Sequence, residues 1–214
     1  MLIQADFRTH HQHTAHVDAN LLVSNSQPSA VTLYAPNTVI YAQGDATGHL
    51  YLVEFGTVRI CRLTADGRRQ ISAFHFAGEV FGFESGAEHH FYAESVDGAG
   101  VRVLRPRSGD KTAQCLLPVA LQNLTRAQEH LLVLGRQNGA EKIAAFLLDV
   151  HERQGAGRVI DLPMQRCDIA DYLGLSFETV SRILTRLKTA GTIRIPHVKQ
   201  IELVDLQELE LLRG

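Results

Sequence analysis

The chain has 214 residues, of which 45% are hydrophobic, so it can bury a core as one large domain or two small ones. Its 21 lysine and arginine residues nearly balance 23 aspartate and glutamate residues, and the net charge of -2 excludes nucleic-acid binding through bulk charge alone. The chain has no run of about 18 apolar residues and no long apolar N-terminal segment. We therefore expect a cytoplasmic protein that does not enter a membrane.

Residues 1–29 form a polar leader that is rich in histidine. The leader contains His10, His11, His13 and His16, and imidazoles at this density attract zinc or nickel. No adjacent carboxylate or cysteine completes a metal site there. We interpret the leader as a flexible segment without a metal site.

Residues 30–110 contain short β-rich runs that are separated by turn residues. Asp66 and Gly67 lie between two alternating runs and predict a β-hairpin. Evenly spaced short strands imply an antiparallel architecture, so we predict an N-terminal double-stranded β-helix, a jelly-roll barrel, in an α+β protein. The runs read VTLYAPNTVIYAQGD, HLYLVEFGTVRICRLTADGRRQISAF, GEVFGFE and VRVLRP.

A helical period replaces the strand pattern over residues 111–138. A narrow apolar stripe with roughly coiled-coil spacing is formed by Leu117, Leu121, Leu124, Leu131 and Leu134. The stripe could pack on the chain's own barrel, but a long helix with a narrow stripe beside a complete barrel favours a partner helix. We predict a dimerisation helix in a homodimer, followed by a hinge around Gly135, Asn138 and Gly139.

Residues 139–214 predict a compact second domain that contains a helix-turn-helix. The first short helix ends at Gly174, and Ser176 is a good N-cap for the second. The apolar faces of the two helices consist of Ile169, Ala170, Leu173, Leu175, Val180, Ile183, Leu184 and Leu187. A hairpin follows at IRIPHVKQIELV, so we predict a winged helix-turn-helix with a terminal amphipathic helix.

The predicted exposed face of the second helix includes Glu178, Ser181 and Arg182. A carboxylate can accept a hydrogen bond from cytosine N4, and an arginine can bond to guanine O6 and N7. Glu178 and Arg182 could instead form a surface i,i+4 ion pair, which stabilises little. Within a helix-turn-helix we favour base contact by both residues, with Ser181 assisting at a neighbouring base or thymine methyl.

The segment around this helix is locally basic. Between Gln165 and Lys199, six lysine or arginine residues stand against three acidic residues. Such an excess attracts DNA phosphates without reading sequence. We assign phosphate contacts to Arg166, Arg186 and Lys188.

Three cysteines, Cys61, Cys115 and Cys167, lie far apart and form no CxxC motif, which argues against disulfides or a cysteine zinc site. Cys167 stands at the start of the first motif helix beside Arg166, and both features favour the thiolate. Oxidation to sulfinate or sulfonate would place negative charge against phosphate. We predict a regulatory thiol whose oxidation weakens DNA binding; the alternative is an inert, small side chain.

These motifs resemble the superfamily of the cyclic-AMP receptor protein and the fumarate-nitrate reduction regulator (CRP/FNR). The resemblance begins near residue 30 and includes GDATGHLYLVEFGTV, GEVFG, the helix at 116–136 and DIADYLGLSFETVSRILTRL. Glu178, Ser181 and Arg182 match the E-x-x-S-R positions of the oxygen-regulator branch, and Phe177 replaces the arginine of the cyclic-AMP branch. The resemblance implies a dimeric activator that binds an inverted repeat of TTGA-like half-sites and contacts RNA polymerase.

Two departures from the family pattern concern its sensors. Gly78-Glu79 of the nucleotide pocket is present, but His89-His90 stands where the phosphate-binding arginine is expected, and a neutral imidazole is a poor substitute. No cysteine precedes Cys61, whereas an iron-sulfur cluster needs about four thiolates. The resemblance is therefore to the FixK type, which implies no cofactor and no need for an effector.

Two alternative functions differ from this one. A metal-dependent cupin enzyme would need an H-x-H pair with a nearby glutamate, and His75, His89 and His90 do not give that spacing. We therefore expect neither an enzyme nor a metal site. A repressor of the same fold with an unidentified small-molecule effector has the same sequence features, so the sequence leaves this alternative open.

Overall fold

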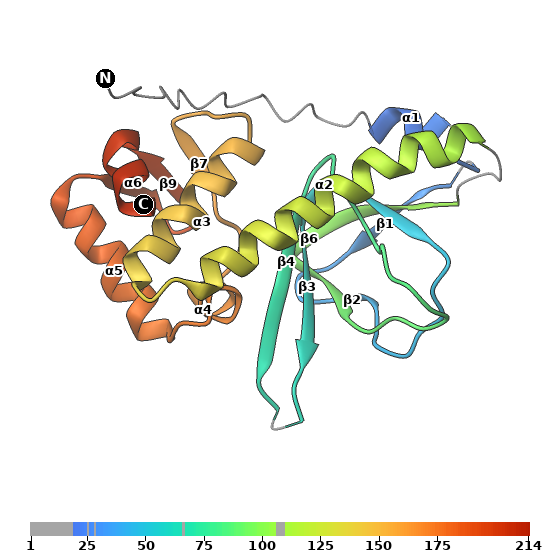
Figure 1. Cartoon of the computed structure of the whole chain (residues 1–214), viewed down its shortest axis with the longest axis horizontal. Coiled ribbons are helices and arrows are strands. Elements are labelled where there is room, and N and C mark those ends of the chain that lie inside the picture. The colour runs from blue at the N-terminus through green and yellow to red at the C-terminus, as the bar shows by residue number, and fades with distance from the viewer. Residues whose placement is uncertain (1–18, 25, 28, 66, 106–109) are drawn as a thin grey trace, which may run out of the picture.

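The computed structural model of the protein describes residues 19–24, 26–27, 29–65, 67–105 and 110–214. A β-sheet domain and a mainly helical C-terminal domain lie side by side, and one long helix runs across both (Figure 1). The leader histidines, His10, His11, His13 and His16, lie outside the described residues.

The N-terminal sheet is antiparallel, with hydrogen-bonded order β1-β6-β3-β4. Two short strands extend it, because β2 also pairs with β6 and β5 also pairs with β3. The strands are β1 (Val31–Tyr34), β2 (Val39–Tyr41), β3 (Leu50–Leu63), β4 (Arg69–Phe76), β5 (Val80–Phe81) and β6 (Tyr92–Leu104).

This sheet folds over a core of its own. Side chains from four strands meet in one buried cluster that includes Tyr41, Val53, Phe81 and Val101. The α+β fold with a C-terminal helix-turn-helix agrees with the prediction. Among the described strands β1 and β4 each pair on one side only, so the hydrogen bonding of the sheet is not closed into a complete ring.

The predicted hairpin joins β3 to β4, with Leu63 opposite Arg69 and Gly67 at a φ of +81°. Asp66 of the predicted turn lies outside the described residues. Strand β6 is longer than the run VRVLRP indicated, because it already begins at Tyr92. A Cβ on Gly56 would lie 2.1 Å from the backbone oxygen of Gly98, so the close approach of β3 and β6 requires glycine there.

The prediction that all of residues 1–29 form a flexible leader is wrong at its C-terminal end. Residues Ala19–Ser24 form helix α1, and Leu22 is buried. Leu22 packs with Leu52, Val80 and Val119 in a third cluster, so this apolar side chain anchors α1 to the sheet and to the long helix.

The long helix α2 (Asp110–Gly135) crosses from the sheet to the C-terminal domain (Figure 1). After a short connection, α3 begins with Asn138 as its N-cap, whose side chain accepts a hydrogen bond from the backbone N–H of Ala140. The remaining elements are α3 (Gly139–Arg153), β7 (Val159–Asp161), α4 (Arg166–Leu173), α5 (Phe177–Ala190), β8 (Ile193–His197), β9 (Gln200–Leu203) and α6 (Leu206–Arg213).

The largest hydrophobic cluster continues from the sheet into the C-terminal domain. Ile71, Phe74 and Phe76 of β4 pack in the same cluster as buried side chains of α3, α4 and α5. Tyr172 of α4 extends this contact, with its ring centroid 5.2 Å from that of Phe74. The two domains therefore share a hydrophobic core, which holds the helix-turn-helix against the sheet.

Candidate nucleic-acid interface

The helix-turn-helix consists of α4 and α5, which are joined at a sharp turn. Gly174 adopts the left-handed conformation, with φ +61°, that ends α4. Ser176 caps α5, because its Oγ accepts a hydrogen bond from the backbone N–H of Thr179 at 3.2 Å. The apolar side of α5 is buried as its period predicts, through Val180, Ile183, Leu184 and Leu187.

The opposite face of α5 exposes Glu178 and Arg182 to solvent. Within the described chain these two side chains do not form an ion pair, so the alternative of a surface salt bridge is not seen. The pKa of Glu178 is lowered because its own backbone N–H and the Ser176 hydroxyl donate hydrogen bonds to the carboxylate. Arg182 is thus free to meet a base edge, while Glu178 also stabilises the first turn of α5.

Ser181 does not lie on the exposed face where the helical period placed it. The residue is half-buried, and its hydroxyl oxygen is covered, with no hydrogen-bond partner among the described residues. It follows directly on buried Val180 and precedes buried Leu184 by three positions, so it stands at the margin of the apolar face. A contact with DNA would require its side chain to rotate.

The three residues assigned to phosphate, Arg166, Arg186 and Lys188, are all exposed. None has an ion-pair partner in the part of the chain that the structure describes. Arg194 of the wing differs, since it lies 3.4 Å from Glu202 across the β8–β9 hairpin. The positive charge of the first three is therefore available to a polyanion.

Cys167 is half-buried in the first turn of α4, and its Sγ lies 3.4 Å from Oε1 of Gln165. Cys61 is buried in the shared core, and burial raises the pKa of its thiol to about 12, which is typical of a packing residue. Cys115 is half-buried near the start of α2.

The stripe predicted for dimerisation lies on α2. Leu117, Leu121, Leu124 and Leu131 are exposed, whereas Leu134 is half-buried against the C-terminal domain. Leu132, which the heptad spacing did not include, is 73% exposed. So many exposed leucines on one helix indicate an interaction surface.

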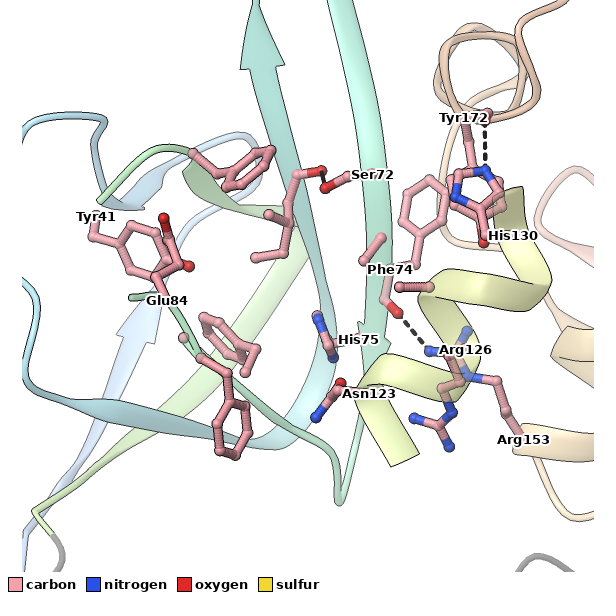
Figure 2. Close-up of a pocket in the computed structure, with 17 residues that line it drawn as sticks. Tyr41, Ser72, Phe74, His75, Glu84, Asn123, Arg126, His130, Arg153 and Tyr172 are labelled. Carbon is pink, nitrogen blue, oxygen red and sulfur yellow. Dashed lines mark hydrogen bonds between the residues drawn. The ribbon is translucent and has the colours of Figure 1, made fainter. Parts of the chain in front are cut away.

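The sheet domain contains a cavity of about 280 Å³ between its strands and α2 (Figure 2). Aromatic rings of Tyr41, Phe81 and Phe91 line it, together with Asn123 and Arg126 of α2. His75 also lines the cavity, and its buried Nδ1 has no hydrogen-bond partner within the described residues.

The glutamate of the Gly78-Glu79 pair is engaged with this chain's own arginines. Arg153 of α3 donates to both Glu79 oxygens, at 3.0 and 2.7 Å, and Arg126 of α2 lies 2.9 Å from one of them. Burial acts to raise the pKa of Glu79, but the charges and hydrogen bonds of these arginines hold it at about 2. His89 stacks on Tyr41 and bonds to Glu84. These residues do not fit a cyclic nucleotide, because the Glu79 carboxylate is occupied by this chain's own arginines and His89 and His90 stand in place of the expected arginine.

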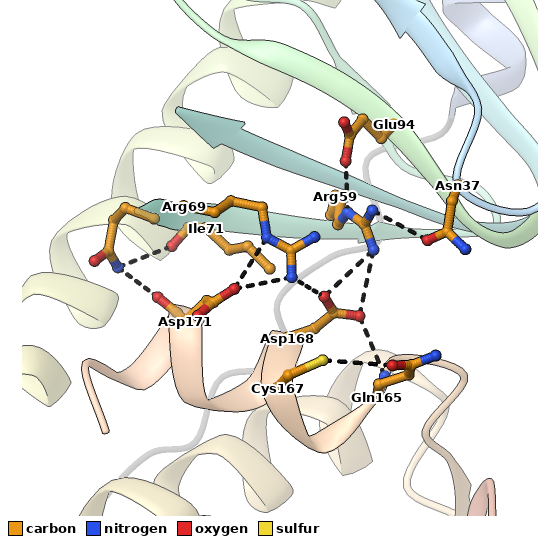
Figure 3. Close-up of polar contacts among 10 residues, drawn as sticks. Asn37, Arg59, Arg69, Ile71, Glu94, Gln165, Cys167, Asp168 and Asp171 are labelled. Carbon is orange, nitrogen blue, oxygen red and sulfur yellow. Dashed lines mark hydrogen bonds and ion pairs between the residues drawn. The ribbon is translucent and has the colours of Figure 1, made fainter. Parts of the chain in front are cut away.

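A further polar cluster, which the sequence did not reveal, joins the sheet to α4 (Figure 3). Arg59 of β3 and Arg69 of β4 both contact the buried carboxylate of Asp168. Arg69 also bonds to Asp171 one turn later, at 2.9 Å. In the sequence these residues look like ordinary surface charges, since 99 or more positions separate the arginines from Asp168.

Comparisons with known proteins agree with this architecture. Residues 141–212 match the Crp-like helix-turn-helix domain, and residues 31–97 match the cyclic nucleotide-binding domain. The chain is 48% identical to the nitrogen fixation regulation protein FixK of Rhizobium meliloti (strain 1021), over 87% of this chain and 89% of that protein. It belongs to the FixK-like regulators of the CRP/FNR family. This FixK-like regulator is therefore a transcription regulator with a DNA-binding helix-turn-helix.

Solved structures extend the agreement to the whole fold of this FixK-like regulator. The structure of FixK2 from Bradyrhizobium japonicum superposes with a TM-score of 0.82 at 37% identity, covering 88% of this chain and 98% of the other. A CRP-family transcriptional regulator from Thermus thermophilus gives a TM-score of 0.73 at 26% identity, covering 86% and 96%. These relatives give no support to the cupin enzyme alternative. Among the described residues, no helix has the length and apolar character needed to cross a membrane.

Proposed function

We propose that this FixK-like regulator is a homodimeric transcription activator that binds an inverted repeat of TTGA-like half-sites without cyclic AMP or an iron-sulfur cluster. The single observation that carries the proposal is the outer face of α5, where Glu178 and Arg182 are exposed and not paired with each other. Exposed side chains that can donate and accept hydrogen bonds are what base readout in the major groove requires.

The chemistry of the two side chains suits the proposed half-site. TTGA contains one guanine, and its complement contains the paired cytosine. Arg182 would donate two hydrogen bonds to guanine O6 and N7, and Glu178 would accept one from cytosine N4. A half-site with thymine or guanine in place of that cytosine would leave the Glu178 carboxylate facing an acceptor oxygen, which adds repulsion to the lost contacts.

The dimer follows from the exposed leucines of α2. Leu117, Leu121, Leu124 and Leu131 are each more than half exposed in the single chain, and a second copy of α2 would cover them. Two-fold symmetry would then place two copies of α5 about 34 Å apart, which matches half-sites on successive turns of DNA.

Equilibrium binding tests the proposal directly. Freshly reduced protein, without added effector, is titrated against labelled duplexes carrying TTGA-N6-TCAA or a scrambled sequence, over a series of salt concentrations. Selective binding of the repeat supports the proposal. Equal and steeply salt-dependent binding to both duplexes would leave only a basic surface and contradict it.

Cys167 gives the proposed regulator a redox input. The thiol is half-buried in the first turn of α4, near the exposed phosphate candidate Arg166. A sulfinate or sulfonate there would repel the DNA backbone and weaken binding. Peroxide treatment of the wild type and of Cys167→Ala tests this idea, because equal loss of binding in both would show that another group is oxidised.

The proposed role as an activator requires contact with RNA polymerase. We propose that this contact is made in the cytoplasm. Two relatives support it by name: the transcriptional activatory protein AadR of Rhodopseudomonas palustris and a probable transcriptional activator of Rhizobium leguminosarum bv. viciae. Transcription from a promoter with a TTGA repeat, using purified polymerase, is expected to rise when the protein is added. A fall in transcription would identify a repressor.

A further inference from the structure

The polar cluster between the sheet and α4 is built around one buried carboxylate. The side chain of Asp168 is 3% exposed, and it lies in the first turn of α4. Both of its oxygens are 3.3 Å from Nη1 of Arg59, and Nη2 of Arg69 also contacts it. The carboxylate additionally accepts a hydrogen bond from the backbone N–H of Gln165. Asp168 thus belongs to the helix-turn-helix but has its charge neutralised by the sheet.

Arg59 is held in place by two contacts on the sheet side of the cluster, in addition to its contact with Asp168. Arg59 bonds through Nε to Glu94 on the neighbouring strand at 2.8 Å, and through Nη2 to Asn37 at 3.1 Å. Its guanidinium is therefore held from two sides, and its remaining donors point at Asp168 (Figure 3). Because a guanidinium is planar, such a held arginine accepts a carboxylate from a narrow range of directions.

A second contact on α4 fixes its rotation as well as its position. Asp171 follows Asp168 by three residues, on the same face of the helix, and accepts a hydrogen bond from Nε of Arg69 at 2.9 Å. Gln70 adds a hydrogen bond from Nε2 to the backbone oxygen of Asp171 at 2.6 Å. Two points one turn apart define the direction of α4 against the sheet.

These contacts lie between α2, the proposed dimerisation helix, and α5, the helix proposed to contact DNA bases. Val119 of α2 packs on the sheet core through Leu52 and Val80, so the sheet is tied to the proposed dimer helix. The direct connection from α2 to the C-terminal domain is a short segment between Gly135 and Gly139. His130 of α2 also contacts the backbone oxygen of Tyr172, at 2.9 Å. The direction of α5 relative to the two-fold axis therefore depends on how α4 sits on β3 and β4.

We infer that the cluster of Arg59, Arg69, Asp168 and Asp171 sets the spacing between the two half-sites that the dimer accepts. The inference rests on the proposed binding to an inverted repeat. Changing the spacer by one base pair moves the second half-site by about 3.4 Å and turns it around the DNA axis. A rigidly held pair of α5 helices accepts one spacer, and a pair that pivots on the Gly135–Gly139 connection accepts several.

Spacer preference measures this directly. Duplexes with TTGA and TCAA separated by five, six or seven base pairs are titrated with the wild type, Arg69→Gln, Asp168→Asn and Arg69→Lys. The wild type is expected to bind its preferred spacer about tenfold or more better than the neighbouring ones. The ratio is expected to fall below about threefold in Arg69→Gln and Asp168→Asn, and to lie between in Arg69→Lys, which keeps the charge but loses the fork.

Two controls separate this role from a general loss of structure. Arg62→Gln removes an exposed arginine from the same strand as Arg59 and is expected to keep the wild-type ratio. A duplex with a single half-site reports the reading face alone, and its affinity is expected to stay within about twofold in every folded variant. Thermal unfolding identifies a variant that has lost its fold, and Arg69, whose side chain is 24% exposed, is the safer site if buried Asp168 tolerates no change.

The outcomes distinguish the inference from the function on which it rests. A wild type that does not prefer the repeat over scrambled DNA contradicts the proposed function. A wild type that prefers one spacer, with the same preference in folded Arg69→Gln and Asp168→Asn, overturns the inference and leaves the function intact.

Discussion

Charged side chains occur in two contrasting environments in this molecule. Between the sheet and the C-terminal domain, Arg59 and Glu79 of the sheet are buried and form ion pairs with Asp168 and Arg153 of the other domain. On the outer surface of the C-terminal domain, Arg182, Arg186 and Lys188 are exposed and have no ion-pair partners among the described residues. The same residue types therefore have different roles according to burial.

The difference follows from the energetics of charge. A buried guanidinium or carboxylate is stable only with a well-oriented partner, so buried pairs fix geometry even where they add little stability. Exposed charges are well solvated and cost little free energy to leave unpaired, so they remain available to bind DNA. Substitutions inside the interface should therefore change stability and orientation, and substitutions on the outer face should change only DNA binding.

The largest effect is expected where the two domains share their core. Ile71→Ala removes a fully buried side chain of β4 that packs in the cluster of α3, α4 and α5. We expect the free energy of unfolding to fall by about 2–5 kcal/mol. Urea denaturation followed by circular dichroism at a helical wavelength measures it.

Ile60→Ala on the neighbouring strand is the matched control, because Ile60 packs in the core of the sheet alone. Ile60→Ala should also lower the free energy of unfolding, but unlike Ile71→Ala in the shared core it should leave the half-site spacing preference of the folded protein unchanged. A loss below about 1 kcal/mol for Ile71→Ala would show that the two domains do not share a core.

On the outer face, Arg182→Ala is expected to weaken binding by about 1–3 kcal/mol per half-site and to relax selectivity at one base position. Its free energy of unfolding should change by less than about 0.5 kcal/mol, because the side chain is exposed and has no ion-pair partner within the described residues. Competition titrations with half-site variants measure both affinity and selectivity. Equal loss on specific and scrambled DNA would remove Arg182 from base readout.

The contrast between these two regions also explains what the sequence could reveal. The helix-turn-helix was predictable because its signals are local: Gly174 ends α4, Ser176 caps α5, and the buried positions recur at the helical period. The same period wrongly predicted that Ser181 is exposed, because the burial of a residue at the margin of an apolar face depends on its neighbours in space. The base contacts of Glu178 and Arg182 stay a prediction.

The contacts between domains were not predictable from the sequence. Arg59 and Asp168 are 109 positions apart, and nothing in their local sequence distinguishes them from solvated surface charges. The sequence pointed to Glu79 as part of the Gly78-Glu79 pair, but it did not reveal its partner Arg153, 74 positions away. Strand β6 was predicted only in its last part, the run VRVLRP, and the close backbone approach of Gly56 to Gly98 that pairs it with β3 has no local signal in the sequence.

In the sheet domain, buried His75 makes the free energy of unfolding depend on pH. Burial lowers the pKa of His75 to about 4, although nearby Glu79 acts in the opposite direction. Between about pH 6.5 and 4 the unfolded chain takes up a proton that the folded chain does not, so stability falls as the pH falls through this window. We expect the contribution of His75 to be about 2 kcal/mol between pH 7 and pH 5.

Urea denaturation at pH 7 and pH 5 measures this contribution. His75→Gln should lose about 2 kcal/mol less stability on acidification than the wild type. His197→Gln, which changes an exposed histidine of the wing, is the control and should behave like the wild type. Equal acid sensitivity in His75→Gln and the wild type would contradict the role of His75.

The smallest effect is expected at Lys188, which tests whether the outer face contains two kinds of contact. Lys188 is exposed in the last turn of α5, away from Glu178 and Arg182 near its start. Lys188→Ala should weaken binding to specific and scrambled duplexes to the same degree and lower the slope of log affinity against log salt by about 1 per subunit. Arg62→Ala removes one positive charge from the sheet domain and should leave that slope unchanged. If Lys188→Ala instead reduces binding to the specific duplex alone, the end of α5 contributes to base readout, and the division between reading and phosphate contact along this helix is wrong.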